Sequence, residues 1–125
     1  MGHKFLIVDD SATERTLLSA MLKELGHDVD ICESTDGVIE KVADGGYAAM
    51  FLDIVLPEQD GYKFLRQLRS NPKTSSQYVV FSSTKRTKLE IDYGIKRAGA
   101  DDYLPKPVSR DNLLEVLQRV KQKVK

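Results

Sequence analysis

The sequence contains a single cysteine and has no excess of charge of either sign. Cys32 cannot form an internal disulfide and fits a small apolar position at the end of a strand, in a protein of the reducing cytoplasm. Lys and Arg total 19, as do Asp and Glu, so the formal net charge is zero. A nucleic-acid-binding domain needs a basic excess on one face, so we expect no direct nucleic-acid partner.

Long apolar runs are also missing. No stretch approaches the ~20 apolar residues of a membrane-spanning helix, so we expect no membrane insertion. Met1 to His3 is too short and too polar for a secretion signal, and Leu6 stands where N-myristoylation needs Ser or Thr. A chain of 125 residues is long enough to bury a core, so we expect one cytoplasmic domain over 1–125, without an output domain.

Five short apolar runs alternate with amphipathic segments along the whole chain. The runs predict strands at 5–8, 29–32, 48–52, 78–81 and 102–104. The segments between them predict helices, and the fourth of these reaches to about Ala98 and carries Leu89, Ile91 and Ile95. Strict alternation predicts an α/β protein with right-handed crossovers and helices on both faces of a parallel sheet. We therefore expect a flavodoxin-like, doubly wound (βα)5 fold with five strands in the order 2-1-3-4-5.

Three acidic residues follow predicted strands directly. Asp9 and Asp10 come after the first strand and Asp53 after the third, and these strands are neighbours in the expected order. Ligands of parallel sheets collect beyond the carboxyl ends of the strands, so the three carboxylates should converge. At an effective dielectric of about 20, each pair of charges ~4 Å apart costs about 4 kcal/mol. A bound cation would relieve this repulsion, and an all-oxygen site suits Mg²⁺.

Simpler roles and other metals fit these residues less well. One Asp after the first strand would be an ordinary helix cap, but two joined by a third at another strand end exceed what capping needs. Zinc is disfavoured because His3 and His27 are poorly placed and Cys32 is alone. Glu58 and Gln59 follow Asp53 in a predicted surface loop.

The last two strand ends add a hydroxyl and an ammonium group. The fourth strand is followed by Ser82, with Ser83 and Thr84 close behind, and the fifth by Lys106 and Pro107. A carboxylate nucleophile, a divalent cation, a hydroxyl and a lysine together match the needs of phosphoryl transfer, which depends mainly on positioning and charge neutralisation.

These motifs resemble those of a known family. The acidic pair at 9–10, Asp53 followed by Ile-Val-Leu-Pro and then Asp-Gly at 60–61, and the segment Gly-Ala-Asp-Asp-Tyr-Leu-Pro-Lys-Pro at 99–107 are similar to receiver domains of bacterial response regulators. The resemblance covers essentially the whole chain and looks closest to single-domain regulators of the chemotaxis and twitching-motility kind.

The resemblance implies a role for each acidic position. Asp53 would accept the phosphoryl group, as an aspartyl phosphate. Asp10 would bind Mg²⁺ directly, and Asp9 mostly through a water molecule. The backbone carbonyl of Val55 would be the third protein ligand.

The resemblance also implies a switch. Lys106 would pair with the phosphoryl oxygens, and the Lys106–Pro107 peptide would be cis. A hydroxyl on the fourth strand would bond to the phosphate, and Tyr103 would turn inward in response. We expect Ser82 to supply that hydroxyl because it directly follows the apolar run. A gapless count to Gly99 would instead select Thr84, and Ser83 lies between them, so all three stay open. With Ser82, this stretch is about two residues longer than usual, which would lengthen the loop or the fourth helix.

As a receiver domain, the chain would take its phosphoryl group from a histidine kinase or a histidine phosphotransfer protein. The change would reach the face made by the fourth helix, fifth strand and fifth helix, where a downstream protein target or a second copy, as a homodimer, would bind. The domain would catalyse only its own phosphorylation and dephosphorylation and would not be an enzyme.

Two other functions are also compatible with the sequence. An aspartyl-phosphate-forming phosphatase usually has Asp-x-Asp after a strand, whereas Val55 stands two residues after Asp53. A phosphorylation-independent, receiver-like interaction module would be expected to lack one of the acids or Lys106, and all are present. Nucleotide binding is disfavoured because residues 9–13 contain no glycine.

Overall fold

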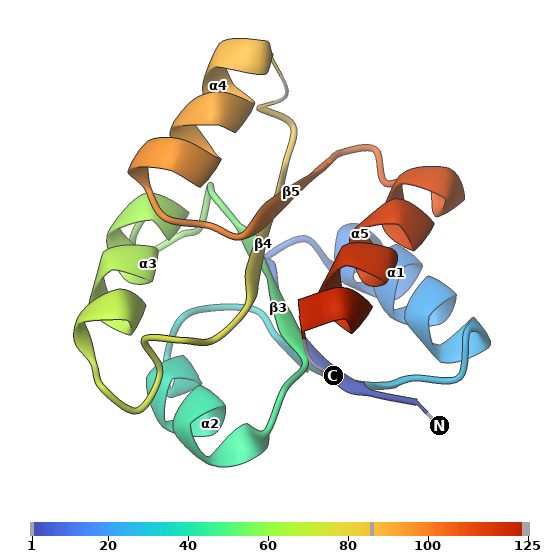
Figure 1. Cartoon of the computed structure of the whole chain (residues 1–125), viewed down its shortest axis with the longest axis horizontal. Helices are drawn as coiled ribbons and strands as arrows, with labels where there is room; N and C mark the ends of the chain where they lie inside the picture. Colours follow the sequence, from blue (N-terminus) through green and yellow to red (C-terminus); the bar gives the residue numbers. More distant parts are fainter. Residues whose placement is uncertain (1, 86, 124–125) are drawn as a thin grey trace.

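A five-stranded parallel sheet runs through the middle of the computed structural model, which describes residues 2–85 and 87–123 (Figure 1). The strands are β1 (Lys4–Val8), β2 (Asp28–Cys32), β3 (Ala49–Asp53), β4 (Val79–Ser83) and β5 (Asp102–Pro105). They lie in the order β2-β1-β3-β4-β5, with every neighbouring pair parallel. The predicted fold class and strand order are therefore confirmed.

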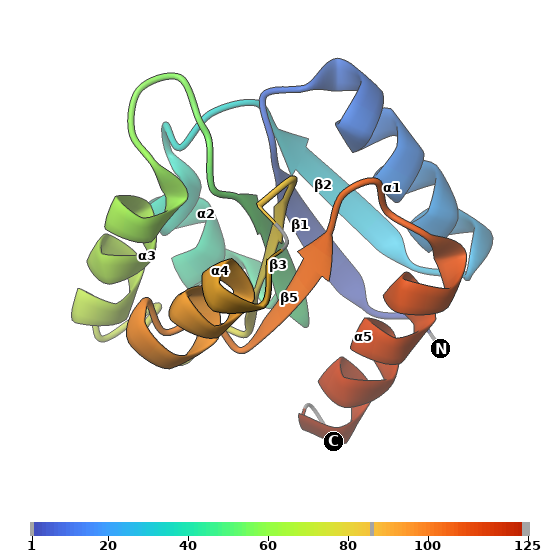
Figure 2. The ribbon, with the colours of Figure 1, turned by 90° about the horizontal axis from the view of Figure 1, so that it is seen from above.

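The helices cover both faces of this sheet (Figure 2). They are α1 (Ala12–Glu24), α2 (Val38–Gly45), α3 (Gly61–Ser70), α4 (Lys88–Asp92) with the π-helical turn η1 (Tyr93–Arg97), and α5 (Arg110–Lys123). Helices α1 and α5 pack on one face, and α2, α3 and α4 on the other. No helix in the described ranges combines the length and the apolar character needed to cross a bilayer.

Alternation of side chains along the central strands builds the two halves of the core. In β1, Phe5 and Ile7 join the cluster under α1 and α5, while Leu6 and Val8 join the cluster under α2 and α3. Successive residues of a strand point to opposite faces, so a continuous apolar run is what a sheet covered on both sides requires. All five residues of β3 and of β4 are buried, which anchors the ends of these strands firmly.

The fourth strand and fourth helix differ from their predicted extents. Strand β4 continues through Ser82 to Ser83, so both serines belong to the strand. The helix changes to a π turn in which Ala98 N–H donates to the carbonyl of Tyr93, five residues back. A π turn holds more residues than an α turn, and it lies in the stretch that was expected to be longer than usual. Of the three apolar residues predicted on the fourth helix, Leu89 is 83% exposed.

Gly94 allows this π turn to lie directly on the sheet. A β-carbon at Gly94 would lie 3.1 Å from the ring of Phe81 and 3.2 Å from that of Tyr103, tighter than an ordinary contact. Tyr103 is buried beneath the turn, and its ring lies edge-on to that of Phe81. The position of η1 therefore depends on the absence of a side chain at residue 94.

Candidate functional site

The three predicted acids meet at the carboxyl edge of the sheet. Asp9 follows β1, with its N–H donating to the carbonyl of Cys32, and Asp53 is the last residue of β3. One carboxylate oxygen each from Asp9, Asp10 and Asp53 lies within 4.8 Å of the others. Asp9 and Asp53 are only 4% and 6% exposed, whereas Asp10 is exposed. The cluster thus has a buried floor and an open side.

Lys106 places its ammonium group against the two buried acids. Its backbone N–H donates to the carbonyl of Ser83, which continues the β4–β5 ladder past Pro105. Its Nζ lies 2.7 Å from Asp9 Oδ2 and 3.5 Å from Asp53 Oδ2, and the residue is 8% exposed. The Lys106–Pro107 peptide is cis, as the resemblance implied.

The environment changes the protonation of both partners. Burial is the largest cause that raises the pKa of Asp53 to about 6, and the charge of Asp9 adds to it, while Lys106 opposes both. Burial acts to lower the pKa of Lys106, but a hydrogen bond with Asp9 and the nearby carboxylates outweigh burial, so the pKa is raised. Near pH 7 the site therefore holds a charged lysine and an Asp53 that is mostly ionised.

The donor set of this cluster suits a small, hard cation. Three carboxylates close together against one ammonium leave an excess of negative charge, and their oxygens are the ligands that Mg²⁺ prefers. His3 and His27 precede β1 and β2, at the opposite edge of the sheet, so neither imidazole is available here. The residues present therefore fit magnesium and do not fit zinc.

The two serines of β4 face different neighbours. Ser82 is paired with Asp53 in the ladder, so their side chains lie on the same face of the sheet. Ser83 lies on the other face, where its Oγ accepts a hydrogen bond from Lys85 N–H at 3.2 Å. Thr84 is past the strand end and exposed. The register therefore places the Ser82 hydroxyl on the face of the acid cluster and the Ser83 hydroxyl on the face of Tyr103. Tyr103 lies on that face because it pairs with Phe81, which shares its face with Ser83.

Tyr103 is held inward by polar contacts at its hydroxyl. The phenol donates a hydrogen bond to the carbonyl of Lys85, in the loop after β4. Burial raises the pKa of Tyr103 to about 12, and a hydrogen bond with the Ser83 side chain acts in the opposite direction. The tyrosine thus connects the β4–α4 loop to the underside of η1.

Comparison with known proteins places this arrangement in a family. The sequence profile described as "Response regulator receiver domain" matches residues 5–118. The chain belongs to this family. Protein PilH of Pseudomonas aeruginosa is 37% identical over 117 residues, which are 94% of this chain and 96% of PilH. Protein PilG of the same organism is 32% identical, covering 94% of this chain and 86% of PilG.

Solved receiver domains have the same architecture. The receiver domain of the sensor histidine kinase PA1611 from P. aeruginosa, solved with magnesium coordinated in its active-site cleft, aligns with a TM-score of 0.82 at 28% identity, over 95% of this chain and 97% of that one. The chemotaxis response regulator CheY4 of Vibrio cholerae aligns with a TM-score of 0.82 at 26% identity, over 96% and 99% of the two chains. This receiver domain is accordingly a phosphoacceptor switch of two-component signalling.

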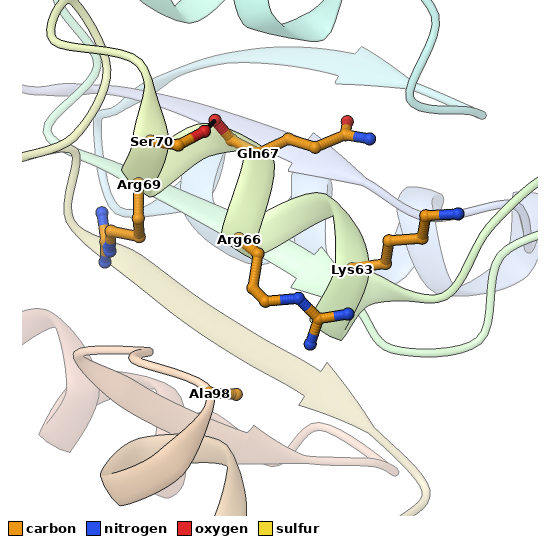
Figure 3. A pocket seen from close by; sticks show the side chains of 6 residues that line it. All are labelled: Lys63, Arg66, Gln67, Arg69, Ser70 and Ala98. Atoms are coloured by element: carbon orange, nitrogen blue, oxygen red, sulfur yellow. Dashed lines mark hydrogen bonds between the residues drawn. The ribbon is translucent and has the colours of Figure 1, made fainter.

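A hollow on the described surface of this receiver domain lies away from the acids (Figure 3). It has a volume of about 680 Å³ between α3 and the end of η1, and its lining contains no carboxylate. The lining residues are Lys63, Arg66, Gln67, Arg69, Ser70 and Ala98. This hollow is therefore separate from the acid cluster, which lies at the strand ends.

Sequence reasoning missed one part of the site. Glu58 and Gln59, assigned to a surface loop, form hydrogen bonds with Thr35 of the β2–α2 loop. These partners are more than 20 residues apart, and no apolar run or glycine marks Thr35 in the sequence. A contact between two loops leaves no periodic signal, so only the folded structure reveals it.

Proposed function

We propose that this receiver domain accepts one phosphoryl group on Asp53 from a histidine kinase or a histidine phosphotransfer protein, with Mg²⁺ beside it. The observation that carries the proposal is the convergence of Asp9, Asp10, Asp53 and Lys106 at one edge of the sheet. Asp53 is the nucleophile because it ends a buried strand at the floor of the cluster.

The reaction is an attack of the ionised carboxylate on phosphorus. As an Asp53 oxygen bonds to the phosphorus of a phosphohistidine, the P–N bond breaks, and the imidazole leaves with the electron pair and takes up a proton. A pKa of about 6 keeps Asp53 mostly ionised near pH 7. Lys106 neutralises charge on the transferring oxygens, and its pairing with Asp9 already holds it in place.

Asp9, Asp10, Asp53 and the backbone carbonyl of Val55 would hold the metal. When bound, Mg²⁺ supplies positive charge that stabilises the transferring phosphoryl group. Val55 N–H donates to Asp53 Oδ1 at 3.2 Å, so the loop that carries this proposed ligand starts against the nucleophile.

The switch acts through the hydroxyls and the buried tyrosine. Ser82 is our candidate for the hydrogen bond to the phosphoryl group because it pairs with Asp53 in the ladder. Ser83 is the alternative because it contacts Tyr103. Movement at Tyr103 would change the α4-β5-α5 face, which we propose as the surface for a downstream target or a second copy.

Labelling with a small phosphodonor tests the proposal. Incubation with Mg²⁺ and acetyl phosphate should add one phosphoryl group by mass, stable in acid and labile in base. The gain should be lost in Asp53→Asn and strongly reduced in Lys106→Ala. Repeated turnover of a phosphoester would indicate a phosphatase, and no gain together with no Mg²⁺ binding would indicate an interaction module.

The hydroxyl is assigned by a matched set of variants. Ser82→Ala, Ser83→Ala and Thr84→Ala are each labelled and then compared by NMR at Tyr103. We expect Ser82→Ala to keep the label and lose the change at Tyr103. If Ser83→Ala or Thr84→Ala alone has that effect, the switch hydroxyl belongs to that residue.

A further inference from the structure

A hydrogen-bond cluster joins the two loops that border the acids, and phosphoryl transfer as proposed above does not use it. Glu58 of the β3–α3 loop accepts two hydrogen bonds through Oε1, from the N–H of Thr35 at 3.0 Å and from its hydroxyl at 3.3 Å. Gln59 Nε2 donates to Thr35 Oγ1 at 3.1 Å. The Thr35 hydroxyl thus acts as donor and acceptor at once, using its single O–H and one of its two lone pairs.

This cluster anchors the middle of the β3–α3 loop. Hydrogen bonds hold the ends of the loop, since Val55 N–H donates to Asp53 and Gly61 N–H donates to the carbonyl of Ile54 at 2.6 Å. Between these ends, the side chain of Leu56 packs into the core. The described hydrogen bonds from residues 56–59 to the rest of the chain all end on Thr35.

Thr35 is itself well placed to act as an anchor. It is 8% exposed, and its carbonyl accepts the N–H of Val38 at the start of α2. Arg15 connects the same β2–α2 loop to the acid cluster, because its Nη1 donates to the carbonyl of Asp9 at 2.7 Å and its Nη2 lies 3.8 Å from Glu33. The segments after β1, β2 and β3 are therefore tied together around the site.

We infer that Thr35, Glu58 and Gln59 are positioning residues for the metal site, which hold the β3–α3 loop, and with it Val55, beside Asp53 before the cation arrives. The inference rests on the proposed function, because it takes Val55 as a metal ligand. A ligand that is already in place loses little conformational freedom on binding, whereas a loose loop must be ordered by the cation. Removal of the anchor should therefore weaken Mg²⁺ binding without touching any ligand.

A pair of substitutions at Thr35 separates the hydroxyl from the rest of the side chain. Calorimetric titration with Mg²⁺ should give a dissociation constant about 10-fold higher for Thr35→Ala, as for other groups that support metal ligands, and about the wild-type value for Thr35→Ser. Glu58→Gln keeps an acceptor oxygen but loses the charge, so it should weaken binding by roughly 3-fold, from the lower strength of neutral hydrogen bonds. If Thr35→Ala does not fold, the Mg²⁺ affinity of Glu58→Gln tests the inference instead.

Two further readouts test positioning directly. The rate of labelling by acetyl phosphate should fall in Thr35→Ala at low Mg²⁺ and recover at saturating Mg²⁺. In chelator, with no metal present, amide hydrogen exchange across residues 54–60 should be faster than in the wild type. Unchanged exchange or a rate that does not recover would overturn the inference.

A buried threonine elsewhere is the matched control. Thr74 Oγ1 donates to the carbonyl of Leu68 at 2.6 Å in the α3–β4 connection. Thr74→Ala should lower stability but leave Mg²⁺ affinity unchanged. If wild type binds Mg²⁺ and is labelled while Thr35→Ala matches it, the inference alone fails. If wild type neither binds Mg²⁺ nor is labelled, the proposed function fails and takes the inference with it.

Discussion

Without phosphate and metal, the Asp53→Asn variant should become more stable relative to wild type as the pH rises. The amide has nearly the same shape as the carboxyl group but cannot ionise. In the folded protein burial raises the pKa of Asp53 from 3.8 to about 6, so the fold favours the protonated form. The stabilisation from that form is complete below about pH 4 and is lost as the pH rises through about 6.

The size of the effect follows from the shift. About two pKa units correspond to roughly 3 kcal/mol, and proton sharing with Asp9 and Lys106 reduces the part that Asp53 alone contributes. We expect the free energy of unfolding of Asp53→Asn, relative to wild type, to increase by about 1 to 3 kcal/mol between pH 4 and pH 7.

Urea unfolding followed by circular dichroism, in chelator at pH values from 4 to 7, measures this difference. Asp36→Asn, at an exposed position, is the control and should show no such trend. Mg²⁺ at about 100 times its dissociation constant should then stabilise wild type by about 2.7 kcal/mol and the variant by less. Parallel pH profiles for wild type and Asp53→Asn would refute the reasoning, because the burial of Asp53 would then carry no penalty.

Three further substitutions test the packing and pairing around the site. Lys106→Met should lower the free energy of unfolding by about 3 kcal/mol at pH 7, because it leaves buried acids without their ammonium partner. This loss should shrink below pH 5, and a loss that does not change with pH would exclude this cause. Gly94→Ala should lower stability by about 1 kcal/mol and displace the ring of Tyr103. Nitration of Tyr103 should therefore be faster, and an unchanged nitration rate would show that η1 moves instead. Arg69→Lys should lower stability by about 2 kcal/mol in thermal melts, because lysine cannot reproduce the guanidinium's bonds to three backbone carbonyls, whereas Arg66→Lys should have almost no effect.

The sequence supports prediction of the fold and of the acid–lysine cluster because their signals are local. Asp9, Asp53 and Lys106 each follow a short apolar run, and a buried strand leaves little freedom for the residue at its end. The strand order follows from alternation and from the handedness of crossovers. Neither the fold nor the acid–lysine cluster requires knowing which side chains contact one another in the folded protein.

Strand and helix boundaries are less predictable. The run 78–81 indicates a strand but not its end, because backbone pairing with β3 and β5 carries β4 on to Ser83. The apolar residues of the fourth helix also did not show which face is buried, because Leu89 lies at the exposed start of a short helix. A window of five residues is too short for periodicity to identify the buried face.

By itself, then, the sequence determined the class of fold, the family, and the edge of the sheet where Asp9, Asp10, Asp53 and Lys106 gather. Only the tertiary structure decided which face each serine of β4 occupies, how a π turn seats Gly94 over Tyr103, and that Thr35 ties down the loop after Asp53. The physical reason is that the first set depends on hydrophobic runs and what directly follows them. The second depends on register, packing distances and hydrogen bonds between segments that are remote in the chain.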